Sequence, residues 1–182
     1  MSEILDSGAR REFSSGAVRD VQEGKGRCDL LPLSVVAEVM SDNVLCEIDI
    51  YVRTGDYNAI VRAIQHFCRN NKMDLCTAML EVAKHYEQGA KKYTERNWEK
   101  GIDLHCYIDS GVRHYLKYKR GDTDEPHDRA FIWNMLCAIW TQTCRPECID
   151  LPYKKVEPTP KSEEATQETK RSIKIHRETC FG

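Results

Sequence analysis

The feature that most constrains the fold of this chain is a nearly continuous apolar run at residues 130–140, AFIWNMLCAIW, which directly follows an acidic segment. A helix that is apolar on all its faces belongs in a protein core, and this run is too short to span a membrane. Asn134 interrupts the run, and a buried carboxamide needs hydrogen-bond partners. The acidic segment at residues 121–128, GDTDEPHD, therefore predicts a charged site at the mouth of a buried helix.

The acidic segment also contains the signals of a helix start. Asp124 or Glu125 can serve as the N-cap, and Pro126 suits the first turn, where its missing N–H costs little. A helix is therefore expected to begin at about residue 125. Glu125 and Asp128 are three residues apart, so both carboxylates can point the same way, as a divalent metal would require.

Amphipathic patterns predict the other helices. Residues 57–68 have apolar side chains at helical spacing, with Asp56 as N-cap, and Asp74 caps a further helix that extends to about residue 93. Helices are also expected at about 32–40, at 42–53, where a helix is favoured over a strand, and at 104–118. No segment reads convincingly as a strand. The expected fold is therefore an all-α bundle of five or six helices with disordered termini.

Length and composition limit the classes of protein that are possible. The 182 residues, 41% hydrophobic and 31% charged, suit one domain at 25–150, with a flexible lead-in at 1–24 and a disordered charged tail at 151–182. A net charge of −2 does not favour nucleic-acid binding. The sequence shows no signal peptide and no membrane span, and its nine cysteines lack CxxC spacing. Free thiols in the cytoplasm are expected.

Metal ligands are predicted on two helices. Glu81 and His85 are one turn apart and could share a metal, although such a polar stripe is more often a solvated face, here opposite an inner stripe of Cys76, Met79, Ala83, Tyr86 and Ala90. Helical bundles build metal sites from inward carboxylates and histidines on facing helices. Together with Glu125 and Asp128, these residues would form a site of mostly oxygen ligands, which favours Mg or Mn over Zn.

A basic and aromatic turn at residues 89–101, GAKKYTERNWEKG, suits a triphosphate. Lys92 and Arg96 supply positive charge, Asn97 supplies amide hydrogen bonds, and Trp98 could stack on a base. Trp98 could equally be a core anchor for the turn. Metal ions that bridge phosphates and polarise a water would use all of these parts, which indicates hydrolysis of a nucleoside triphosphate.

Four segments carry a family resemblance: GKGRCDLLP at 24–32, EVAKHYEQGAKKYTERNWEKG at 81–101, DSGVRHYLKYKRGDTDEPHD at 109–128, and the apolar run after them. In these segments the chain resembles the phage and prophage dATP/dGTP diphosphohydrolases (MazZ-like), relatives of the all-α MazG-type pyrophosphohydrolases. The resemblance implies a purine dNTP as substrate, dNMP and pyrophosphate as products, a homo-oligomer, and the bacterial host cytoplasm if the protein is phage-encoded. Residues 41–73 then look like an inserted helical segment.

The resemblance also implies the roles of individual residues. The expected catalytic residues are Glu81, His114, Glu125 and Asp128. The expected nucleotide-binding residues are Lys92, Arg96, Asn97, Trp98, Arg113, Lys117 and Asn134. The expected metal ligands are Glu81, His85, Glu125 and Asp128.

Two alternatives remain open from the sequence. The dipeptide His127–Asp128, with His85 or His114 before it and Asp150 after it, mimics the metal-binding pattern of HD phosphohydrolases, some of which release triphosphate from dNTPs. The other alternative is a non-catalytic helical module that binds nucleotides or dimerises. Release of tripolyphosphate would indicate the first, and ligand binding without turnover would indicate the second.

Overall fold

The computed structural model of this chain describes residues 8–155, and within them the chain forms six α-helices and one small two-stranded sheet, which confirms the predicted all-α class. The helices are α1 (Leu33–Met40), α2 (Asn43–Thr54), α3 (Tyr57–Asn70), α4 (Leu75–Lys92), α5 (Leu104–Arg120) and α6 (His127–Cys144). Short 3-10 helices are η1 (Cys28–Leu30), η2 (Asn97–Lys100), η3 (Pro146–Cys148) and η4 (Pro152–Lys155). No helix in this part of the chain is long and apolar enough to cross a membrane.

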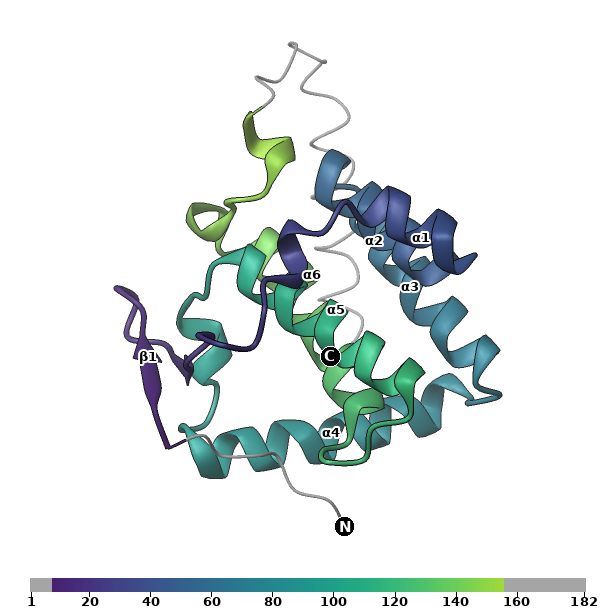
Figure 1. Cartoon of the computed structure of the whole chain (residues 1–182). Helices are drawn as coiled ribbons and strands as arrows, with labels where there is room; N and C mark the ends of the chain where they lie inside the picture. Colours follow the sequence, from purple (N-terminus) through teal and green to yellow (C-terminus); the bar gives the residue numbers. More distant parts are fainter. Residues whose placement is uncertain (1–7, 156–182) are drawn as a thin grey trace, which may run out of the picture.

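The pair α5 and α6 forms the centre of the molecule, with α4 across one end and α1 to α3 grouped on one side (Figure 1). The two central helices approach closely at Gly111, where an added Cβ would clash with the side chain of Met135. Aromatic rings join the central pair to α3, since the ring of Phe67 lies 4.9 Å from that of Phe131 and 6.0 Å from that of Tyr115. The apolar run of α6 therefore lies in the core, as its composition predicts.

Aspartate caps set the starts of three helices where the sequence places them. Asp42 accepts hydrogen bonds from the N–H groups of Val44 and Leu45, and Asp56 and Asp74 cap α3 and α4. The expected cap of α6 is wrong. That helix begins at His127 after Pro126, without a side-chain cap, so both predicted capping residues, Asp124 and Glu125, precede the helix.

The N-terminal segment contains an element that the sequence analysis did not predict. Strands β1 (Arg10–Glu12) and β2 (Val18–Asp20) pair antiparallel, with Arg10 opposite Asp20. The side chain of Asn97 secures this hairpin, because it accepts from the N–H of Val18 at 2.9 Å and donates to its C=O at 2.8 Å. The partner that orders the hairpin is thus distant in the sequence, which is why local composition indicated a flexible lead-in.

The C-terminal segment packs further than predicted. Leu151 is buried, and the ring of Tyr153 lies 6.1 Å from that of Tyr51, so residues 151–155 contact the α2 side of the molecule. The rest of the predicted tail, and residues 1–7 of the predicted lead-in, lie outside the described residues. The eight cysteines in the described part are free thiols, as expected.

Candidate active site

A cavity of about 1010 Å³ opens between the N-terminal hairpin, the C-terminal half of α4, one face of α5 and the start of α6. Its polar lining is mainly cationic, carboxylate and imidazole groups, and its apolar lining is mainly aromatic. The lining includes Arg19, His85, Arg96, Asn97, Trp98, Arg113, His114, Lys117, Glu125, Trp133 and Asn134. Nine of the sequence-predicted site residues are in this set, and Glu81, Lys92 and Asp128 are not.

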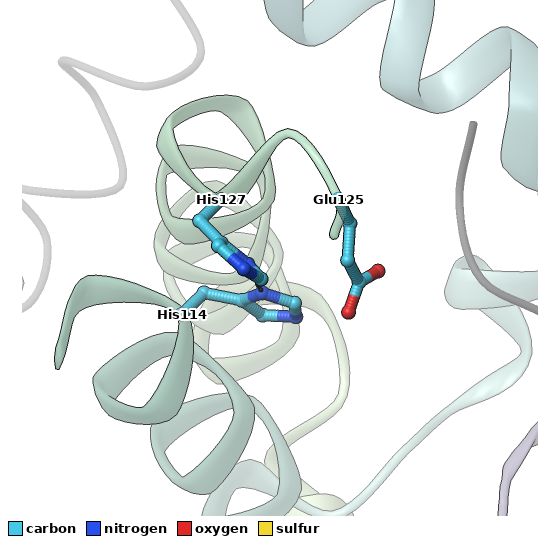
Figure 2. A group of neighbouring side chains, drawn as sticks. All are labelled: His114, Glu125 and His127. Atoms are coloured by element: carbon cyan, nitrogen blue, oxygen red, sulfur yellow. Dashed lines mark hydrogen bonds between the residues drawn. The ribbon is translucent and has the colours of Figure 1, made fainter. Parts of the chain in front are cut away.

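Two histidines and a glutamate form a compact polar group at the cavity wall, which His114 and Glu125 line and His127 supports (Figure 2). His114 on α5, Glu125 before α6 and His127 in the first turn of α6 offer ligand atoms that all lie within 4.8 Å of one another. The Nδ1 atoms of the two imidazoles are 2.9 Å apart, at hydrogen-bond distance. Three residues from two elements are thus directed at one point, which is the arrangement that a metal ion or a reacting water needs.

Asp124 fixes the orientation of the His127 ring. Its carboxylate is 2.8 Å from Nε2 of His127 and 2.7 Å from Nζ of Lys117, and these two partners hold the pKa of Asp124 well below its usual range. With both rings neutral, His127 donates to Asp124 through Nε2, so its Nδ1 accepts from Nδ1 of His114. The Nε2 lone pair of His114 is then available on the side where Figure 2 shows the Glu125 carboxylate.

Burial keeps His114 uncharged. Desolvation first, and then the unfavourable interaction that a protonated His114 would have with His127, lower the pKa of His114 well below its usual value. A neutral imidazole is required for a metal ligand or a proton acceptor. The environment of His114 therefore favours the catalytic role that the resemblance implies.

His85 occupies a different place from the one its helical spacing predicts. The buried face of α4 consists of Ala78, Val82 and His85, whereas Met79, on the predicted inner stripe, is exposed. Because α4 packs on α6, the His85 ring lies 5.4 Å from the ring of Trp133. Burial, followed by nearby positive charges, lowers its pKa to about 4, and its buried Nδ1 has no hydrogen-bond partner among the described residues.

The metal ligands predicted from helical spacing do not form one group in the structure. Glu81 forms ion pairs with Lys84 and, at 3.7 Å, with Arg129. Asp128 lies away from the cavity lining, and its charge contributes, after burial, to raising the pKa of Tyr118. Among the described residues, no group of three potential ligands within 4.8 Å includes Glu81, His85 or Asp128. Helical spacing failed for Glu125 and Asp128 because Glu125 precedes the helix.

The basic and aromatic turn largely holds the cavity wall together. Lys92 contacts Asp20 of the hairpin at 2.7 Å, and both ends of the Asn97 amide bond to the backbone of β2. The Trp98 ring packs edge-on against Trp140 at 4.8 Å, as the core-anchor alternative predicted. Arg96 is exposed and pairs with Glu99.

Three other predicted residues line the cavity with their own partners. Arg113 donates to Asp109 at 2.6 Å, and Lys117 donates to Asp124. The Nδ2 of Asn134 donates to the C=O of Ala130 at 2.8 Å, so the buried carboxamide is satisfied within its helix. Its Oδ1 accepts a hydrogen bond from Nη2 of Arg19 at 3.0 Å.

Sequence reasoning missed three residues of this site. Asp124 was considered only as a helix cap, and His127 only as part of an HD dipeptide; their spacing of three residues across Pro126 was the available signal. Arg19 reaches the cavity from the hairpin, and nothing in its local sequence indicates this. Asp150, required by the HD alternative, instead accepts from the backbone N–H of His105 at 3.0 Å and contacts its ring.

The fold is thus an all-α bundle with a cavity that has cationic, acidic and aromatic side chains beside a histidine and carboxylate group. Residues 69–150 match the family model described as dATP/dGTP diphosphohydrolase, N-terminal. This segment contains α4, α5 and α6, and the match supports its resemblance to the dATP/dGTP diphosphohydrolases. No curated protein and no solved structure shows a significant match.

Proposed function

We propose that this protein is a metal-dependent diphosphohydrolase that converts a purine dNTP and water into dNMP and pyrophosphate. The observation that carries this proposal is the group of His114, Glu125 and His127, of which His114 and Glu125 line a cavity that also contains Arg113 and Lys117. The group lies within the segment that matches the diphosphohydrolase family. In the proposed reaction, water attacks the α-phosphorus, and the bond from that phosphorus to the bridging oxygen of the leaving pyrophosphate breaks.

The cavity supplies the charge that such a reaction needs. Arg113 and Lys117 line it from one face of α5, one turn apart, and would neutralise phosphate oxygens as negative charge moves onto the leaving pyrophosphate. His114 Nε2 and the Glu125 carboxylate face the same part of the cavity and can accept hydrogen bonds from the attacking water. These residues come from the matched segment, so the proposal requires no contribution from α1 to α3.

The residues present fit a divalent metal, but they fit Mn²⁺ better than Mg²⁺. Two imidazoles and one carboxylate are a donor set typical of first-row transition metals, whereas Mg²⁺ prefers oxygen ligands and bound water. The Asp124 carboxylate on Nε2 of His127 is the kind of partner that orients a metal-binding imidazole. His114 and Glu125 would hold the ion, and His127 would join them through Nδ1 in exchange for its hydrogen bond with His114; the ion would supply charge neutralisation and a bound water of lowered pKa.

Product analysis tests this proposal. The purified protein is incubated with each dNTP and NTP, with Mn²⁺, with Mg²⁺ and with chelator, and the products are separated by ion-exchange chromatography. We expect dAMP or dGMP together with pyrophosphate, formed faster with Mn²⁺ and not with chelator. Deoxynucleoside and tripolyphosphate would contradict the proposal and favour HD-type chemistry. Binding without turnover would favour the non-catalytic module, and the mass of the particle in solution tests the expected homo-oligomer.

A further inference from the structure

The N-terminal hairpin lies outside the family-matched segment, yet it forms one wall of the cavity. In the view of Figure 1 the hairpin lies on the opposite side of the α5 and α6 pair from α1 to α3. Val18, Arg19 and Asp20 of β2 line the cavity together with residues of the matched segment. The cavity is therefore incomplete without a part of the chain that the family match does not include.

Arg19 is the residue that the hairpin directs at the buried end of the cavity. Its guanidinium lies over two aromatic rings, 5.0 Å from the centre of the Tyr107 ring and 5.8 Å from that of Trp133. Its Nη2 donates to Oδ1 of Asn134 at 3.0 Å. Stacking on rings and a fixed hydrogen bond restrict the arginine to one orientation, so little conformational freedom is left to lose when a ligand binds.

The other terminal nitrogen of Arg19 has no partner. Nη1 is buried and forms no hydrogen bond to the described residues, and none of their carboxylates lies within ion-pair distance of Arg19. Arg113 and Lys117 differ in this respect, because each is paired with an aspartate. A buried charged donor without an acceptor is costly, and an anion in the cavity would remove that cost.

We propose that Arg19 binds a phosphate oxygen of the nucleotide through Nη1, so that the N-terminal hairpin is part of the substrate site. Only the identity of the nucleotide rests on the proposed function; the anion site itself rests on the geometry of Arg19. Asp20, the acidic neighbour of Arg19 on β2, does not compete for this role, because Arg10, Lys92 and Tyr93 already bond to its carboxylate.

This site gives the basic and aromatic turn a positioning role. Lys92 and Tyr93 bond to Asp20, and Asn97 bonds to both backbone groups of Val18, so the residues on either side of Arg19 are held by that turn. The sequence predicted direct contact of Lys92 and Asn97 with the nucleotide. In the structure these two residues instead fix the strand that carries the anion-binding arginine.

The test measures binding without turnover. Calorimetry in chelator compares pyrophosphate, dATP and deoxyadenosine as probes on the full chain, for the wild type and for Arg19→Gln, Arg19→Lys and Arg69→Gln. A charged hydrogen bond of this kind corresponds to a roughly ten- to hundredfold loss of affinity for pyrophosphate and dATP in Arg19→Gln. Affinity for deoxyadenosine should not change. Arg19→Lys should lose less, and Arg69→Gln, an exposed arginine at the end of α3 that does not line the cavity, should match the wild type.

The proposal is overturned if Arg19→Gln binds pyrophosphate as tightly as the wild type, which would leave Arg19 a purely structural cation on two rings. An equal loss for deoxyadenosine and dATP would also overturn it. If circular dichroism shows that Arg19→Gln does not fold, Arg19→Lys decides, because it retains the charge and the stem but not the guanidinium fork. Phosphate binding through Arg19 in a protein that releases no pyrophosphate would uphold this site and reject the proposed reaction.

Discussion

The buried carboxylates of the α1 to α3 region differ from two nitrogen-bearing side chains of the cavity, those of His85 and Arg19, in whether their hydrogen bonds are satisfied. Asp49 accepts from the N–H of Ser34 at 3.1 Å and from Arg53 at 2.7 Å, and Asp42 is bonded by two helix-start N–H groups and by the hydroxyl of Tyr115. Around the cavity, Nδ1 of His85 and Nη1 of Arg19 are buried without partners.

This difference separates stabilising groups from ligand-binding groups. A satisfied buried carboxylate contributes to stability, and its removal leaves several donors unpaired. An unsatisfied buried group destabilises the unliganded protein, and on a cavity wall a ligand can supply the missing partner. The hydroxyl of Tyr51 on α2 is also without a partner among the described residues, but Tyr51 does not line the cavity. Substitutions in the two regions should therefore have separate effects, one on the free energy of unfolding and the other on binding and turnover.

The largest effect on activity is expected from a comparison of Glu125 and Asp128. Helical spacing predicts the same role for both acids, but only Glu125 lines the cavity. Glu125→Gln should lower kcat roughly 10²- to 10⁴-fold, because the carboxylate faces the cavity beside His114. Asp128→Asn should retain most of the activity, since Asp128 does not line the cavity. Steady-state release of pyrophosphate measures both. An equal loss of activity in the two variants would mean that Glu125 and Asp128 act together, as helical spacing predicted. It would contradict the site described by the structure.

Asp42→Ala should give the largest loss of stability of the polar substitutions. It removes the N-cap of α2 and leaves the buried hydroxyl of Tyr115 without its acceptor, which together cost about 2 to 4 kcal/mol. Urea denaturation followed by circular dichroism measures the change, with exposed Glu23→Ala as the control. The affinity of the folded variant for pyrophosphate should equal that of the wild type. A loss of affinity would contradict the expectation that substitutions in the α1 to α3 region affect stability and not binding.

His85→Leu tests the same difference with a cavity residue, whose replacement should affect binding and not stability. Removing an imidazole that is buried and not fully bonded should leave the free energy of unfolding unchanged or raise it by up to about 1 kcal/mol. Nucleotide affinity should fall, because the ring lines the cavity. Thermal unfolding and calorimetry on the same sample measure the two effects. A variant that is clearly less stable but binds normally would place His85 among the structural groups.

The sequence predicts those parts of the structure that depend on contacts between residues close together in the chain. The starts of α2, α3 and α4 are predictable because Asp42, Asp56 and Asp74 bond to N–H groups two or three residues away. The burial of the apolar run in α6 is predictable because every face of it is apolar. Local signals of this kind define the helices, and hence the fold class.

The arrangement of the site depends on longer-range contacts. His85 was expected on a polar outer stripe, but α4 turns that residue towards Trp133 of α6. Arg19 reaches Asn134 only because Asn97 secures the hairpin across the cavity. His114 and Glu125 were predictable as candidates from their residue types, whereas their grouping with His127 follows from a loop conformation before α6 that no periodic pattern specifies.

The smallest expected effect concerns a titrating pair outside the cavity, His105 and Asp150. Bonding to Asp150 raises the pKa of His105 to about 10, and bonding to His105 opposes burial and lowers the pKa of Asp150 below its usual value. The raised histidine pKa stabilises the fold fully below pH 6.5, the ordinary histidine value, and this contribution is lost as the pH rises towards 10. The lowered carboxyl pKa stabilises the fold above its ordinary value and is lost in acid.

Urea denaturation of the wild type and of His105→Gln, across pH 5 to pH 10, isolates this pair. The difference in free energy of unfolding should be largest at the acidic end of this range and should decrease through the upper half, with a total of at most about 1 kcal/mol because Asp150 is exposed. Turnover measured at a fixed pH should be the same in both proteins. A difference that is independent of pH would mean that packing of the ring, and not its charge, connects α5 to the segment after η3. A change in turnover would extend the functional region beyond the cavity.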